Sequence, residues 1–207
     1  MVRGGSVSLA LVMLWPMSML SAQSFSTQSL PPSVQALVLH EVEMQTLGGR
    51  QFWSDIQFFG EYRIQQNVFT DHYRLLDGRD WRHQWGTLAE CQVKLAQIRE
   101  KKKLPPMSGR GVILLHGILR SNKSMQTLAS SLKEDGYTVF PFEYPSTQIS
   151  IPEAAAALDN VIQHLDGIEE LSLVGHSMGG LVIRAYFAEY HDPRIRRVVM
   201  LGTPNHG

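Results

Sequence analysis

The sequence contains a single cysteine and no excess of either charge. Cys91 has no second thiol to pair with, so disulfide content gives no indication of the cellular compartment. Nineteen basic residues balance nineteen acidic ones over 207 residues, so the formal net charge is zero. Without a strong field of one sign, we expect neither nucleic acid as a partner nor a polyanionic substrate.

The sequence also lacks, near its N-terminus, an apolar stretch of the usual length of a transmembrane helix. Arg3 precedes an apolar stretch over residues 7–20, which Pro16 interrupts and which small and polar residues follow. The stretch is short for a transmembrane helix but typical of a secretory signal peptide within residues 1–22. We therefore predict export to the periplasm or the exterior. The alternative is an uncleaved anchor through residues 7–20, which would associate the protein with a membrane.

Residues 23–109 carry no motif that can be placed in a known family, and no role is predicted for them. A polar linker containing Pro31 and Pro32 comes first. The hydrophobic pattern then predicts a helix over 34–47, one or two strands within 52–85, and a helix over 87–102 in which Cys91 is a small buried residue.

Residues 110–207 show a regular alternation of strand and helix. Short apolar runs predict strands at 111–115, 137–144, 171–174 and 197–201, and helical spacing predicts helices at 121–135, 152–167 and 181–190. Alternation with short connections implies right-handed crossovers. We therefore predict an α/β fold with a doubly wound parallel sheet and helices on both faces.

The sequence Gly175-His176-Ser177-Met178-Gly179 falls between the third strand and the third helix. This G-x-S-x-G pattern is the nucleophile elbow, in which a strained turn raises the serine hydroxyl above the sheet. Glycines are needed two residues before and after the serine because the backbone segments there approach closely. The alternative is an unreactive serine in a tight strand-to-helix turn.

Two further segments accompany the elbow: Leu-Leu-His-Gly at 114–117 and Leu-Gly-Thr-Pro-Asn-His-Gly at 201–207. Together with Gly-His-Ser-Met-Gly-Gly they resemble bacterial α/β-hydrolase lipases and esterases, including triacylglycerol-lipase-like members, over residues 110–207. The resemblance implies an α/β-hydrolase fold and hydrolysis of an apolar ester or lipid through an acyl-enzyme on Ser177. It implies no cofactor and no metal.

The resemblance also assigns an oxyanion hole. In this fold the loop after the first core strand donates one backbone N–H, and the residue after the nucleophile donates another. These would be the amides of Ile118 and Met178, with Gly117 allowing close approach of the backbone. His116 is expected to be structural and to hydrogen-bond the loop backbone.

The resemblance leaves the triad incomplete. The family places its acid and then its histidine after later strands, so we expect both beyond residue 207. The chain would then hold only the N-terminal half of the core, without the last strands, and would be inactive or impaired, since a serine without a base is a weak nucleophile. His206 is the one histidine expected to come near the serine, and His176 is expected to point away into the packing. His164, His191 and Asp192 are expected away from the site.

Three alternatives remain open. The first is a non-catalytic hydrolase remnant that binds a partner or an acyl ligand at the membrane. Thioesterase or amidase activity is the second, because the elbow serves any acyl transfer. A haloalkane-type hydrolase is the third and is disfavoured, because that chemistry needs a carboxylate in place of Ser177.

Overall fold

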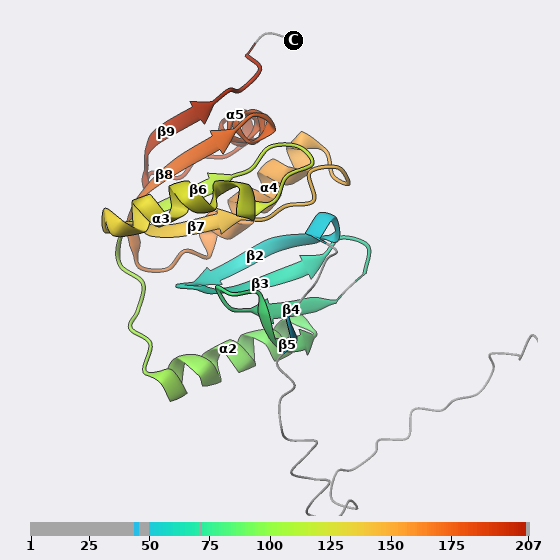
Figure 1. Ribbon diagram of the computed structural model, residues 1–207, viewed down its shortest axis with the longest axis vertical. Helices are drawn as coiled ribbons and strands as arrows, with labels where there is room; N and C mark the ends of the chain where they lie inside the picture. The colour runs from blue at the N-terminus through green and yellow to red at the C-terminus, as the bar shows by residue number, and fades with distance from the viewer. Residues whose placement is uncertain (1–43, 46–49, 71, 206–207) are drawn as a thin grey trace, which may run out of the picture. The chain divides into compact units, whose positions relative to one another are not determined.

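A computed structural model describes residues 44–45, 50–70 and 72–205 (Figure 1). The predicted signal peptide or anchor, the linker and most of the predicted helix at 34–47 lie outside these residues. Where that helix can be checked, at Met44–Gln45, the chain forms a short strand, so the predicted helical end is wrong. Among the described residues, no helix has the length and apolar composition needed to cross a membrane.

The described elements follow one another in two blocks. The first block contains β1 (Met44–Gln45), η2 (Arg50–Phe52), β2 (Trp53–Phe59), β3 (Tyr62–Asn67), β4 (Tyr73–Leu76), β5 (Trp81–Gly86) and α2 (Leu88–Lys102). The second contains β6 (Gly109–Leu115), η3 (Asn122–Met125), α3 (Gln126–Glu134), β7 (Thr138–Phe142), α4 (Ile151–Gln163), β8 (Ile168–His176), α5 (Met178–Glu189) and β9 (Ile195–Leu201).

The second block forms the predicted parallel sheet, with strand order β7-β6-β8-β9. Its central strand β6 is apolar on both faces, because alternate residues point to opposite sides. Val112 and Leu114 pack with Ala129 of α3 on one face. Ile113 and Leu115 share the core of α4 and α5 on the other. The doubly wound arrangement with helices on both faces is therefore confirmed.

The first block forms an antiparallel sheet of order β1-β5-β4-β3-β2, in which α2 packs against β3, β4 and β5 (Figure 1). The expectation of one or two strands was too low. Strand β3 is buried at four successive residues, and two of these, Arg63 and Gln65, are polar. Burial of polar side chains removes the apolar alternation by which a strand is recognised. Cys91 of α2 is buried, as expected.

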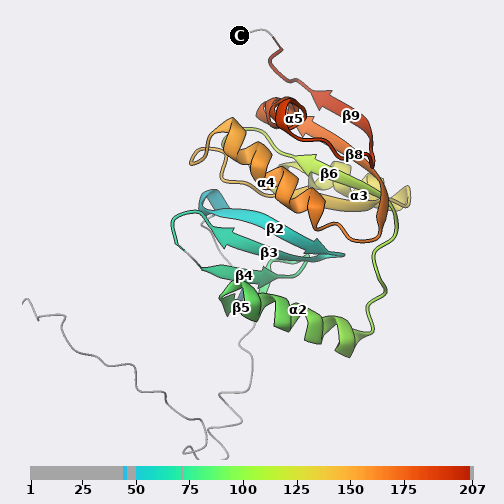
Figure 2. The same cartoon turned by 180° about the vertical axis from the view of Figure 1, so that it is seen from behind.

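The two sheets approach each other where β2 meets the end of β7 (Figure 1), and β2 also lies beside α4 (Figure 2). The backbone N–H of Asp55 donates to the carbonyl oxygen of Glu143 at 2.9 Å. Phe58 of β2 lies against Phe140 of β7 with ring centroids 5.5 Å apart. Side chains of both sheets also belong to one continuous hydrophobic core. The described part of 23–109 is thus packed directly against the parallel sheet.

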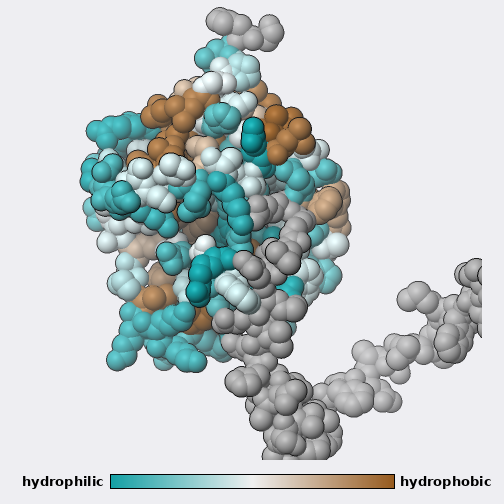
Figure 3. Space-filling view, viewed as in Figure 1, coloured by the Kyte–Doolittle hydropathy of each residue, from teal (hydrophilic) through white to brown (hydrophobic). Residues whose placement is uncertain are grey.

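Strand β9 is an exposed edge of the parallel sheet. It pairs with β8 on one side only among the described strands. Four consecutive apolar residues, Val198, Val199, Met200 and Leu201, are 37–46% exposed. Figure 3 shows hydrophobic side chains at the surface in this part of the sheet.

Candidate active site

Ser177 sits in the sharp turn that joins β8 to α5. Its backbone has φ 52° and ψ −117°, a conformation that a residue with a side chain adopts only under strain. The N–H of Ser177 donates to the carbonyl oxygen of Leu201 at 2.8 Å, which ties the turn to the end of β9. Ser177 is half-buried. The predicted strand, turn and helix are all present.

The elbow glycines are required by close backbone approach. A Cβ atom on Gly175 would lie 2.6 Å from the nitrogen of Gly180. A Cβ atom on Gly179 would lie 2.5 Å from the carbonyl oxygen of Leu115. Both distances are to backbone atoms, which cannot rotate out of the way. The expectation that crowding selects glycine at these positions therefore agrees with the geometry.

The loop after β6 lies directly against the elbow. A Cβ atom on Gly117 would lie 3.2 Å from the Cβ of Ser177, so the loop backbone and the nucleophile are in contact range. The loop is closed by a hydrogen bond from the N–H of Arg120 to the oxygen of Gly117 at 3.2 Å. The N–H of Leu119 donates to the Ser146 hydroxyl at 3.2 Å. Ile118 and Met178 therefore flank Ser177 from two different elements; their role as oxyanion donors stays a prediction.

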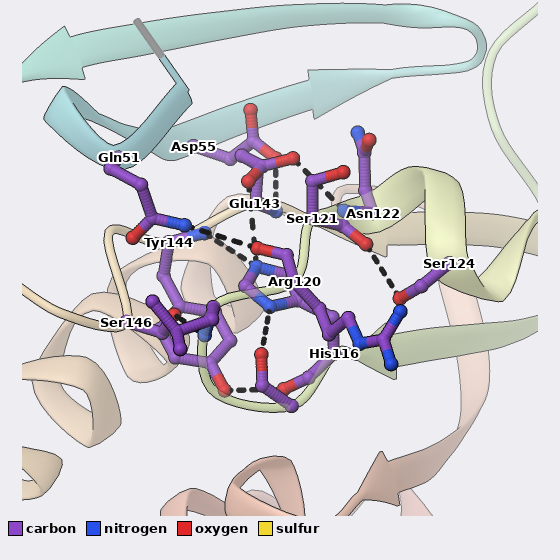
Figure 4. Close-up of polar contacts among 12 residues, drawn as sticks. Gln51, Asp55, His116, Arg120, Ser121, Asn122, Ser124, Glu143, Tyr144 and Ser146 are labelled. Atoms are coloured by element: carbon purple, nitrogen blue, oxygen red, sulfur yellow. Dashed lines mark hydrogen bonds and ion pairs between the residues drawn. The ribbon is translucent and has the colours of Figure 1, made fainter.

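His116 is completely buried beneath this loop (Figure 4). Its Nδ1 lies 2.9 Å from the carbonyl oxygen of Gly117. Its ring stacks on Tyr144 with centroids 4.4 Å apart and an angle of 14° between the planes. The Tyr144 hydroxyl donates to the His116 carbonyl oxygen at 2.6 Å. These contacts agree with a structural role in the loop, because they engage the ring with Gly117 and Tyr144.

Among the described residues, no histidine ring is hydrogen-bonded to the Ser177 hydroxyl. The side chain of His176 is exposed and not enclosed in packing, but it lies beside the elbow, since a Cβ atom on Gly117 would be 3.1 Å from its Nδ1. His176 ends β8 at the carboxyl edge of the sheet, two residues before α5 begins at Met178. His164 is exposed at the end of α4, with Nδ1 2.6 Å from the Asn160 oxygen, and His191 is exposed after α5. His206 lies outside the described residues.

Asp192 belongs to a structural ion pair. Its Oδ2 lies 2.9 Å from Nη2 of Arg194. The hydrogen bond from Arg194 is the main cause that lowers the pKa of Asp192. Arg194 also donates to the carbonyl oxygens of Leu165 and Ile162 at the end of α4, at 2.8 and 2.7 Å. Asp192 therefore fastens the ends of α4 and α5, and is not part of a triad, as expected.

Two buried carboxylates near the loop after β6 were not predicted from the sequence. Glu143, at the end of β7, is 2% exposed, and its Oε1 lies 3.5 Å from Nε2 of His116. Asp55 of β2 is fully buried, and this burial raises its pKa to about 6 despite the nearby Arg63 and the N–H of Glu143. A charged residue at the end of a predicted buried strand was a signal for Glu143; nothing local marked Asp55.

Comparison with known proteins agrees with this geometry. Residues 111–207 match the family model for the alpha/beta hydrolase fold. A lysosomal thioesterase PPT2 homolog of Drosophila melanogaster is 25% identical over 123 residues, which cover 56% of this chain and 43% of that protein.

Solved structures also match part of the chain. An extracellular alpha/beta-hydrolase from a Paenibacillus species is 25% identical with a TM-score of 0.40, covering 45% of this chain and 40% of that one. The esterase EaEST from Exiguobacterium antarcticum is 24% identical with a TM-score of 0.41, covering 47% and 39%. The chain thus spans less than half the length of each of these relatives. Residues 111–207, which form the sheet, the elbow and the loop facing it, thus have the α/β-hydrolase fold.

Proposed function

We propose that this protein is a serine hydrolase that cleaves carboxylic esters through an acyl-enzyme on Ser177. One observation carries the proposal. A half-buried serine with φ 52° links the end of a central parallel strand to the start of a helix, with a glycine loop facing it. Strain of this kind persists where the surrounding structure imposes it, and it is concentrated at functional sites.

The chemistry that fits this geometry is acyl transfer. The oxygen of Ser177 attacks the ester carbonyl carbon, the bond to the leaving alcohol breaks, and the acyl group remains on the serine. Water then hydrolyses the acyl-serine to a carboxylic acid and free enzyme. The amides of Ile118 and Met178 would donate to the negative oxygen that forms in each step. This route needs no metal and no cofactor.

The proton of the serine hydroxyl must move to a base. No imidazole or carboxylate is hydrogen-bonded to this hydroxyl within residues 50–70 and 72–205. We propose that the histidine and its orienting acid come from outside these residues, and that the described residues alone react slowly. A serine without a base loses several orders of magnitude in rate.

The surface beside the serine favours an apolar acyl group. Ile118 and Leu119, in the loop facing Ser177, are 52% and 76% exposed. Exposed aliphatic side chains next to a nucleophile favour contact with hydrocarbon over contact with charge. We therefore propose an apolar ester or lipid as substrate. Export through residues 1–22, or anchoring by residues 7–20, would place the protein near such substrates.

Thioester hydrolysis is a second candidate. The Drosophila relative that matches over 123 residues is named a lysosomal thioesterase. An elbow serine attacks a thioester carbonyl by the same steps, with a thiol as the leaving group. A matched pair of acyl substrates, one an oxygen ester and one a thioester, separates the two candidates by their kcat/KM.

A fluorophosphonate probe tests the proposed function. We expect it to modify Ser177, located by mass spectrometry, and we expect the Ser177→Ala variant to remain unmodified. Added imidazole should accelerate the modification, because it replaces an absent base. A folded chain that stays unmodified with and without imidazole would exclude catalysis and favour the alternative, a non-catalytic remnant that binds a partner or an acyl ligand.

A further inference from the structure

The carbonyl oxygen of Gly117, in the oxyanion loop, is held by the ring of His116 as well as by the N–H of Arg120. Nδ1 of His116 lies 2.9 Å from the carbonyl oxygen of Gly117. A carbonyl oxygen can only accept, so Nδ1 must carry the proton. In a trans peptide the C=O and the following N–H point in opposite directions. Fixing the Gly117 oxygen beneath the loop therefore directs the N–H of Ile118 to the opposite side.

The His116 ring is in turn held on its other edge. Nε2 accepts a hydrogen bond from the N–H of Tyr144 at 3.5 Å, and Oε1 of Glu143 lies 3.5 Å from the same nitrogen. Oε1 of Glu143 is buried and has no hydrogen-bond partner among the described residues. Figure 4 shows Glu143 and Tyr144 close to the His116 ring. Burying a carboxylate oxygen that accepts no hydrogen bond costs free energy. The contact of this oxygen with the His116 ring is therefore kept in spite of that cost.

The position of Glu143 is fixed by the antiparallel sheet. Its N–H donates to Oδ2 of Asp55 at 2.7 Å, and its carbonyl oxygen accepts from the N–H of Asp55 at 2.9 Å. Its Oε2 accepts from the N–H of Asn122 at 3.0 Å. Backbone and side chain are thus held together, which leaves Glu143 a single position.

A polar row continues from Asp55 across the sheet. Oδ1 of Asp55 accepts from Nε2 of Gln65 at 2.7 Å, and Oε1 of Gln65 accepts from Nε of Arg74 at 2.9 Å. The three residues are in register on β2, β3 and β4 and are at most 5% exposed. Buried polar rows of this kind stabilise less than aliphatic packing but fix geometry closely.

We propose that Glu143 and His116 are positioning residues of the oxyanion loop, and that the antiparallel sheet holds them in place through Asp55. This inference rests on the proposed function, since it names what supports the Ile118 amide. It gives the described part of residues 23–109 a role in the active site. Neither residue touches the substrate; both act through the Gly117–Ile118 peptide.

Nuclear magnetic resonance of the 207-residue chain tests the positioning without any need for catalysis. In the unchanged protein, ¹⁵N-labelled histidine should show a protonated Nδ1 on His116. In Glu143→Gln, the His116 ring nitrogens and the Ile118 amide should shift. The matched change Glu170→Gln, at an exposed carboxylate of β8, should leave the resonances of the His116 ring and the Ile118 amide unchanged. An unprotonated Nδ1 in the unchanged protein would overturn the proposal even if the variant failed to fold.

The rate of fluorophosphonate reaction with Ser177 gives a second readout. The Glu143→Gln change should slow the covalent step about tenfold to a hundredfold, because a displaced oxyanion donor lowers rates by that order. The half-saturating probe concentration should change by less than about threefold, since the reagent's own contacts are untouched. A variant that reacts at the unchanged rate would refute the proposal. Failure of the unchanged protein to react would count against the proposed function alone, and the resonance measurement would still decide the positioning.

Discussion

The two sheets of this protein bury side chains of different kinds. In the parallel sheet, strand β6 places Val112 and Leu114 on one face and Ile113 and Leu115 on the other, so both faces are aliphatic. The antiparallel sheet buries aliphatic side chains towards α2, such as Ile64 and Leu75, but β3 also buries charged and amide groups. Aliphatic packing supplies most of the stability in such a fold, whereas buried polar groups fix positions. One sheet carries the strained turn at Ser177, and we propose that the other supports the loop facing it.

Glycine substitutions should give the largest contrast between the sheets. We expect Gly179→Ala to prevent folding, a loss of more than about 5 kcal/mol, because the new Cβ would lie 2.5 Å from a backbone oxygen. Gly60→Ala, in the β2–β3 turn, has open space at φ 57° and should lose only about 1 kcal/mol. Denaturant unfolding measures both. Equal losses would show that the elbow is not crowded.

Matched core truncations test whether the sheets unfold together. Leu115→Ala in β6 and Leu75→Ala in β4 both remove a fully buried side chain of the core that the two sheets share. Each should lower the free energy of unfolding by about 4 kcal/mol. Since the sheets share a core, one cooperative transition should shift in both variants. Separate transitions in calorimetry, with only one shifted by each variant, would show that the sheets are independent.

The titration of Asp55 should appear in the stability of the unchanged protein. Burial raises its folded-state pKa from 3.8 to about 6, so the folded protein binds more protons than the unfolded chain between these values. Stability should therefore fall as the pH rises through this window, by at most about 3 kcal/mol. Asp55→Asn removes the group, and its stability should lack this component. The test is the difference in unfolding free energy between the two proteins from pH 4 to pH 7; a constant difference would contradict the raised pKa.

Substitutions at helix caps should change the free energy of unfolding least, and by the same amount in the two regions. Thr87 caps α2 and Ser150 caps α4, each in a reciprocal capping box with a glutamate. Replacing either with alanine should cost about 1 kcal/mol, because each removes one hydrogen bond to a free helical N–H. Thermal unfolding of both variants measures this. A much larger loss for Thr87→Ala would mean that α2 supports the antiparallel sheet more than its packing suggests.

The parallel sheet could be predicted from sequence because its strands are buried on both faces. Runs such as Val112 to Leu115 satisfy the strand pattern without help from distant residues. The elbow could be predicted for a related reason, since glycine at 175 and 179 avoids a collision with nearby backbone atoms. Boundaries shifted by a few residues, as they do when helix ends depend on packing.

The antiparallel sheet could not be predicted in the same way. Burial of Arg63, Gln65 and Arg74 depends on partners on neighbouring strands, and a local window contains no information about those partners. The same reason explains why Asp55 and Glu143 were missed, since they are 88 residues apart in the chain and meet only in the folded structure. The exposure of His176 also followed from its surroundings and not from its neighbours in sequence.

By itself, the sequence determined the alternation of strand and helix after residue 110, the position of the sharp turn at Ser177 and the glycines that crowding requires there. These features depend on short-range sterics and on hydrophobic periodicity, and both can be detected in a short stretch of consecutive residues. Only the tertiary structure decided that a second sheet meets the first at β2 and β7, and that a buried polar row reaches the loop facing Ser177. Pairing between distant strands sets those contacts, and the energy of a buried charge depends on the partners it finds there.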